Sequence, residues 1–255
     1  MTMIETELRK WKRNKIVWGI LALTILLAVF AINRACSISR SSPYMDSFGD
    51  LYTLAFKNLT SLFLPIVLGM FATTLFFDEQ KNDTLKELLI IPISKAQLYF
   101  TKIAVVILMS VVLCVVTFLL SMIGGFVAGG FPDLSSDSLL QAALLYLAGG
   151  VLVPIAMLPI IFLATLSKGY VLPIGATLLY LVPVVIAPAY LMGLHPLASV
   201  MGIYARFSPA AAEMVESWTQ GTPTTAPLEL CLISILIVGI ISAGASVLAL
   251  RKQSY

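Results

Sequence analysis

Charged residues are scarce in this chain of 255 residues: they make up 11% of it, whereas hydrophobic residues make up 59%. Soluble domains have roughly 25% charged and about 45–50% apolar residues, so this composition excludes a soluble globular protein and a disordered chain. The formal net charge of +3 is too small for a nucleic-acid-binding surface. A polytopic membrane protein remains, and its apolar windows of helical length predict an all-α fold.

The chain also has little of the chemistry that catalysis or metal binding requires. It has one histidine, His195, and three cysteines without metal-ligand spacing. No glycine is followed by lysine, so a phosphate-binding P-loop is absent, as are H-E-x-x-H and G-x-S-x-G motifs. We therefore expect no catalytic residue, no metal site and no cofactor on this chain.

Long apolar windows are the most abundant feature of the sequence. A helix needs about 20 apolar residues to cross a bilayer, and six spans are predicted, with the fourth and fifth separated at Lys168. The windows are Ile16–Asn33, Asn58–Phe77, Ile103–Pro132, Ser138–Ser167, Gly169–Ala205 and Leu230–Leu250. The first window is interpreted as a retained helix, because no convincing signal-peptide cleavage site follows it. The central parts of the spans hold none of the ionisable residues that ion-coupled carriers use, so coupling to ions is disfavoured.

The distribution of lysine and arginine predicts the orientation. With the N-terminus inside, twelve basic residues are cytoplasmic and four lie outside, at positions 34, 40, 57 and 206. Both termini are therefore expected in the cytoplasm. Seven acidic residues also fall in the outer segments, at positions 46, 50, 133, 137, 213, 216 and 229, and give those segments a formal charge of −3.

Two segments outside the predicted spans, one at the N-terminus and one in the cytoplasm, carry further signals. Residues 1–15 are basic and amphipathic, which indicates an elbow helix in the inner interface or a basic tail that only sets orientation. In the cytoplasmic loop 78–102, Thr84 and Glu87 have capping-box spacing and Pro92 ends the helix that begins there. Ser94 and Gln97 form a second capping box that begins the third span. This loop helix either docks on a partner or lies on the lipid surface.

The outer segment 190–227 separates the fifth and sixth spans. Ser208 and Pro209 predict a helix over Ala210–Trp218, because they supply an N-cap and a proline at the first helical position. The apolar stretch Leu197–Tyr204 precedes it. We expect short helices that dip into the outer leaflet, with an ordinary loop as the alternative. The glycine pairs and G-x-x-x-G spacing, such as Gly125 and Gly129, indicate close helix packing within the chain or a dimer seam.

With this organisation the chain resembles the ABC type-2 permease family, the membrane subunits of type-2 ATP-binding-cassette exporters. The resemblance covers residues 1–255 as a single transmembrane domain, and its most specific stretch is Phe77–Lys102. The family pattern E-x(4)-T-[LK]…L-L-x-x-P-[IV]-S…K is matched at Glu79, Thr84, Leu85, Leu88, Leu89, Pro92, Ser94 and Lys102. Within the family the sequence of this stretch is most similar to permeases of bacitracin- and lantibiotic-type peptide export and immunity systems.

The resemblance implies a permease of the bacterial plasma membrane that pairs with a second six-span subunit. It also implies that Leu85–Ile91 is a coupling helix that docks on a separate cytoplasmic ATPase, where ATP and Mg²⁺ would bind. The substrate path cannot be assigned from the sequence. Alternatives are a permease for a lipid-linked molecule or an ion, a non-transport anchor, sensor or assembly protein, and an intramembrane enzyme, for which acid, base and nucleophile clusters are missing.

Overall fold

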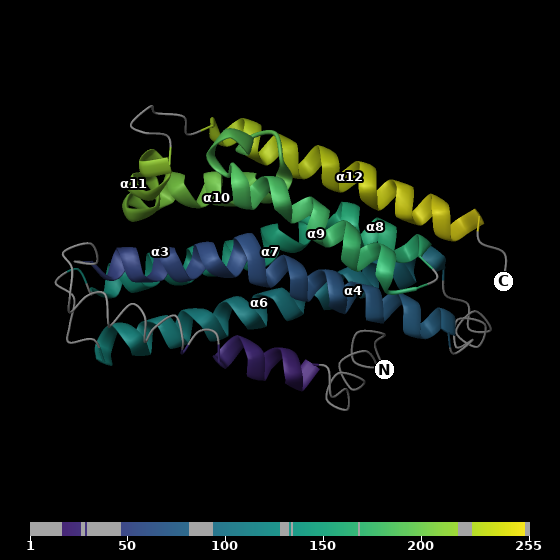
Figure 1. The fold of residues 1–255 in the computed structure, drawn as a ribbon, viewed down its shortest axis with the longest axis horizontal. Coiled ribbons are helices and arrows are strands. Elements are labelled where there is room, and N and C mark those ends of the chain that lie inside the picture. Colours follow the sequence, from purple (N-terminus) through teal and green to yellow (C-terminus); the bar gives the residue numbers. More distant parts are fainter. Residues whose placement is uncertain are drawn as a thin grey trace.

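The computed structural model describes residues 17–26, 29, 47–81, 94–127, 133, 135–167, 169–218 and 226–252, with only the backbone for residues 78–81. The described part is built from helices that run side by side along one long axis (Figure 1). The predicted all-helical class is therefore confirmed for these residues. The predicted elbow, residues 1–15, lies outside them.

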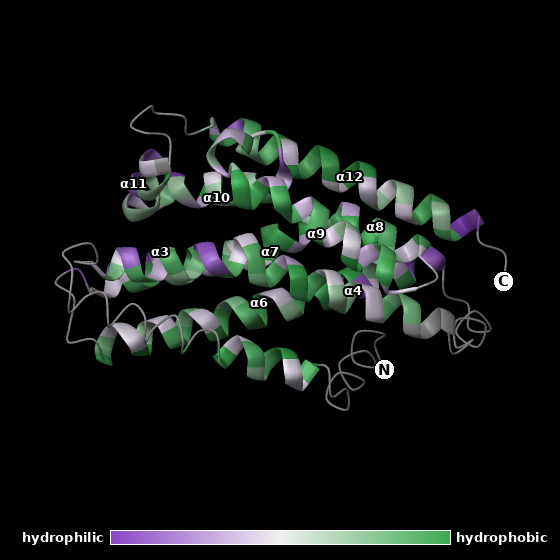
Figure 2. Ribbon diagram, viewed as in Figure 1, coloured by the Kyte–Doolittle hydropathy of each residue, from purple (hydrophilic) through white to green (hydrophobic). Residues whose placement is uncertain are grey.

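Four helical stretches are long and apolar enough to cross a membrane: Phe48–Phe77, Lys95–Val127, Ser136–Ala156 and Leu228–Lys252. Val17–Leu26 and Val171–Ile186 are apolar but shorter. The chain is thus a multi-pass membrane protein, and the count of six spans stays a prediction. Hydrophobic residues dominate the helices, and hydrophilic ones gather near the bundle ends, apart from a band within α3 (Figure 2).

The second predicted span begins ten residues earlier than the window Asn58–Phe77 indicated. Helix α3 (Phe48–Asn58) continues through the π-helical segment η1 (Leu59–Phe63) into α4 (Leu64–Lys81). Ser47 is the N-cap of α3, and its Oγ accepts a hydrogen bond from the N–H of Asp50. Lys57, which the charge pattern placed in an outer loop, therefore lies on the spanning helix.

The fourth predicted span, Ser138–Ser167, is two helices, α7 (Ser136–Ala156) and α8 (Leu158–Leu166). They meet at Met157, whose φ of −90° and ψ of 0° leave the helical region. Pro159, at the start of α8, lacks the N–H that would continue the backbone ladder, which explains the break at this position.

The fifth predicted window, Gly169–Ala205, is also subdivided. Helix α9 (Val171–Ile186) is followed by the short η2 (Ala189–Leu191), a turn at Gly193 with a φ of +83°, and α10 (Pro196–Phe207). Glycine is favoured there because only it adopts positive φ without strain. Helix α11 (Pro209–Trp218) confirms the helix predicted over Ala210–Trp218.

The core lies where α3, α7 and α10 meet. Phe56 stacks on Tyr204 with ring centres 3.8 Å apart and meets Tyr146 edge-on at 5.1 Å. The Tyr146 hydroxyl donates to the backbone carbonyl of Tyr52 at 2.7 Å, which satisfies its polar end inside the core. Long helices α6 (Lys95–Val127) and α12 (Leu228–Lys252) flank this centre and present exposed apolar side chains, which suits contact with lipid.

Candidate functional site

The residues predicted to couple the chain to an ATPase follow α4. Most lie outside the described residues, namely Thr84, Leu85, Leu88, Leu89, Pro92 and the side chain of Glu79. Ser94 is described, and its Oγ accepts a hydrogen bond from the N–H of Gln97 at 3.1 Å, which makes it the N-cap of α6. The coupling role of these residues stays a prediction.

The helix that follows the predicted coupling segment is hydrogen-bonded to two neighbouring helices. Lys102 on α6 is only 2% exposed; its ammonium donates to the backbone carbonyl of Leu75 on α4 and lies 4.6 Å from the centre of the Phe76 ring. Lys95 Nζ donates to the backbone carbonyl of Leu250 on α12 at 3.0 Å. Lysine side chains near the start of α6 therefore connect this helix to α4 and α12.

A cavity of about 620 Å³ lies at the opposite end of the bundle, where the N-termini of α3, α7 and α11 converge. Three acidic side chains line it, Asp50, Asp133 and Glu213, and none of the described residues in its lining is basic. Its other lining residues are Ser47, Gly49, Tyr52, Ser138, Gln141, Pro209 and Ala210. This cavity is called here the acidic end cavity.

Hydrogen bonds fix two of these carboxylates. Asp133 accepts the N–H of Phe48 at 2.7 Å and that of Gly49 at 3.0 Å, two groups that the first turn of α3 leaves without helical partners. Ser47 Oγ donates to Asp50 Oδ2 at 2.7 Å. Among the described residues no group of three or more histidine, cysteine, aspartate or glutamate residues is arranged to hold a metal ion. The acidic end cavity is thus lined by carboxylates that backbone and side-chain groups hold in place.

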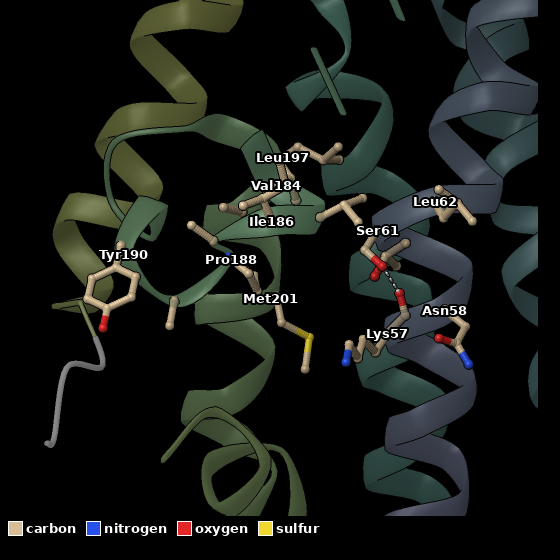
Figure 3. Close-up of a pocket in the computed structure, with 15 residues that line it drawn as sticks. Lys57, Asn58, Ser61, Leu62, Val184, Ile186, Pro188, Tyr190, Leu197 and Met201 are labelled. Carbon is tan, nitrogen blue, oxygen red and sulfur yellow. Dashed lines mark hydrogen bonds between the residues drawn. The ribbon is translucent and has the colours of Figure 1, made fainter. Parts of the chain in front are cut away.

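A second cavity, of about 460 Å³, lies beside the π-helical segment and is called here the Lys57 cavity. Its polar side is formed by Lys57, Asn58, Thr60 and Ser61, and its apolar side by the end of α9, the turn through η2 and the start of α10. Figure 3 shows Lys57 and Met201 extending toward each other across the space between α3 and α10.

The sequence did not predict the Lys57 cavity because the charge pattern placed Lys57 in an outer loop and not on a helix. A signal for the helix was present: Ser47 is followed three residues later by Asp50, a spacing typical of a helix start. Counting the helix from that cap makes Lys57 its tenth residue, directly before the uncharged run from Asn58 to Phe77.

Two comparisons relate the chain to known proteins. A family model described as "ABC-2 family transporter protein" matches residues 3–184. The chain is 30% identical over 117 residues to a bacitracin transport permease protein, BCRB, of Bacillus licheniformis. The aligned part covers 44% of this chain and 56% of that relative, so it spans about half the length of the relative.

Proposed function

Because this chain belongs to the ABC-2 transporter family, we propose that it is the membrane permease subunit of an ATP-driven exporter that removes an amphipathic peptide antibiotic from the membrane. A separate cytoplasmic ATPase would supply the energy, and a second six-span subunit would complete the translocation path. The bacitracin permease among its relatives supports a peptide as substrate. The structure carries this proposal through one observation, the acidic end cavity.

The chemistry of that cavity suits a cationic, amphipathic peptide. Three carboxylates from three different elements face one space of about 620 Å³, and no basic residue lines it within the described part of the chain. Opposite charge raises the local concentration of a ligand and its rate of association. The apolar surface of such a peptide would then contact the hydrophobic helices that lead away from the cavity, while its basic groups stay at the charged end.

The coupling step can be tested at the segment between α4 and α6. In Leu88→Asp a charge stands on the predicted apolar face of the loop helix, and an unpaired charge is costly to desolvate against a partner. We expect normal membrane insertion and lost co-purification with the ATPase. Asn82→Asp is the matched control, because it adds the same charge outside the Leu85, Leu88 and Leu89 face. Full association and transport by Leu88→Asp would refute the docking role.

The substrate can be tested in a sensitive bacterial host that expresses the chain together with its ATPase. Growth-inhibitory doses of a lantibiotic, bacitracin and a hydrophobic dye are compared with those for a complex whose ATPase is inactive. We expect the complex to protect the host against a peptide. Protection should be weaker with Glu213→Gln, which removes one charge from the acidic end cavity. Unchanged sensitivity to every peptide, with the complex intact and hydrolysing ATP, would reject the peptide and favour a lipid-linked molecule or ion.

A further inference from the structure

Lys57 lies well inside a helical stretch that is long and apolar enough to cross a membrane. It lies nine residues after Phe48, which places it roughly 14 Å along the helix axis from the start of α3 at 1.5 Å per residue. The apolar run then continues without a charged residue to Phe77. A charged side chain within a spanning segment is costly, and such residues commonly face a cavity and mark a ligand pathway.

The walls of the Lys57 cavity combine one cation with an apolar surface. Among the described residues that line the cavity, Lys57 is the only charged one. Facing it are apolar residues of α9, the following turn and α10, including Val184, Ala198 and Met201. The volume, about 460 Å³, lies in the range of roughly 300–1,000 Å³ that holds small-molecule ligands.

The π-helical segment shapes the polar side of this cavity. Thr60 Oγ1 donates to the backbone carbonyl of Phe56 at 2.8 Å, and Ser61 Oγ donates to that of Lys57 at 2.6 Å. These hydroxyls engage two carbonyls at the point where the helical register changes. Single-turn π segments occur frequently at functional sites, because they locally rearrange the side chains and backbone groups of a helix.

The edge of the cavity is strongly apolar and exposed. Ile186 is 76% exposed, Tyr190 70% and Leu62 51%. These side chains line the same cavity as Lys57, so a ligand that enters it would contact an ammonium group and a hydrocarbon-like surface together. This combination favours a ligand that carries both a negative charge and a hydrocarbon chain over a free anion or an uncharged hydrocarbon.

We propose that the Lys57 cavity binds the anionic headgroup of a membrane amphiphile, a molecule with a phosphate or carboxylate next to a hydrocarbon chain. Lys57 is the counter-ion of the headgroup, and the apolar edge contacts the start of the chain. A charge-assisted hydrogen bond is stronger than a neutral one. This site goes beyond the proposed export of peptides, and its ligand binds whether or not the ATPase is present.

The test uses the full chain, purified in a neutral maltoside detergent without ATPase, and equilibrium binding of four probes. Dodecyl phosphate carries both charge and chain, dodecanol only the chain, inorganic phosphate only the charge, and dodecyltrimethylammonium the opposite charge. We expect dodecyl phosphate to bind at least about tenfold more tightly than each of the others, as one charge-assisted contact of about 1.5–3 kcal/mol requires. Equal binding of dodecanol or of inorganic phosphate would overturn the proposal.

Substitutions at Lys57 test whether its positive charge contributes to the binding of dodecyl phosphate. Lys57→Gln should bind dodecyl phosphate about tenfold more weakly, whereas Lys57→Arg should stay within about threefold of the original chain, because it keeps the charge. Arg206→Gln is the matched control, since Arg206 is an exposed cation of α10 that does not line the cavity. Melting temperatures identify any unfolded variant, and the comparison of dodecyl phosphate with dodecanol on the original chain tests the proposal if Lys57→Gln does not fold.

Two further outcomes would contradict the proposal. One is unchanged binding of dodecyl phosphate by a folded Lys57→Gln. The other is efficient disulfide cross-linking between two copies of Leu62→Cys in a bilayer, with a yield that dodecyl phosphate does not lower. A second copy of the chain would then cover the edge of the cavity. Loss of peptide protection alone leaves this binding result intact, so the two proposals fail separately.

Discussion

Gly149 of α7 lies against the aromatic core, where there is no room for a side chain. A Cβ atom added at Gly149 would lie 2.5 Å from Cε2 and 2.6 Å from Cζ of Phe56. Phe56 cannot easily move, because it is stacked on Tyr204 and meets Tyr146 edge-on. The glycine is therefore required for the close approach of α7 and α3. Gly244 of α12 is the matched position, since nothing lies within 4 Å of its added Cβ.

The expected change in the free energy of unfolding follows from a comparison of two substitutions, Gly149→Ala and Gly244→Ala. Replacing a helical glycine with alanine gains about 1 kcal/mol from backbone propensity, and this gain applies to Gly149→Ala and Gly244→Ala alike. Overpacking a core with an extra methyl group costs about 1–3 kcal/mol. We therefore expect Gly149→Ala to be about 1–3 kcal/mol less stable than Gly244→Ala, and Gly244→Ala to be as stable as the original chain or more so.

The free energy of unfolding can be measured for each variant by titrating SDS into maltoside micelles and following far-UV circular dichroism. Phe56→Leu supplies the second half of a double-mutant cycle, because a smaller side chain at position 56 leaves room for the new Cβ. The penalty of Gly149→Ala should shrink in that background. Equal stabilities of Gly149→Ala and Gly244→Ala, or a penalty that Phe56→Leu does not relieve, would refute the proposed packing.

Three other predictions concern topology, a buried hydroxyl and pH. A cysteine within Gln220–Thr225 should react with an impermeant thiol reagent in whole cells and one at Asn82 should not; reversed labelling would overturn the predicted orientation. Ser110→Ala should keep or raise the free energy of unfolding in micelles, because the buried Ser110 hydroxyl has no hydrogen-bond partner in the described structure; a loss above about 1 kcal/mol would argue against this. Burial lowers the pKa of His195 from its ordinary 6.5, so the unfolded chain gains a proton first and stability should fall as the pH decreases below about 6.5. His195→Asn keeps an acceptor for the N–H of Leu197 and should weaken this acid sensitivity of the melting temperature; an identical pH profile would contradict the assignment.

The sequence by itself determined the class of the protein and several local features. Long apolar windows predicted a multi-pass helical membrane protein, and the resemblance to the ABC-2 family is confirmed by the match over residues 3–184. The start of α11 at Pro209 and the N-cap at Ser94 also followed from the sequence. These features depend on residues close together in the chain, and local hydropathy and capping rules describe them adequately.

Only the tertiary structure decided where α3 begins, where the fourth predicted span breaks and which partners surround two of the lysines. Helix α3 starts at Phe48 partly because Asp133, 85 residues away, accepts its first N–H groups. Lys102 is buried because Phe76 and the carbonyl of Leu75 on another helix receive its ammonium. Lys57 faces a cavity because α9 and α10 pass beside its helix. A hydropathy window sums over neighbouring residues, whereas the free energy of these polar groups depends on partners that distant segments provide.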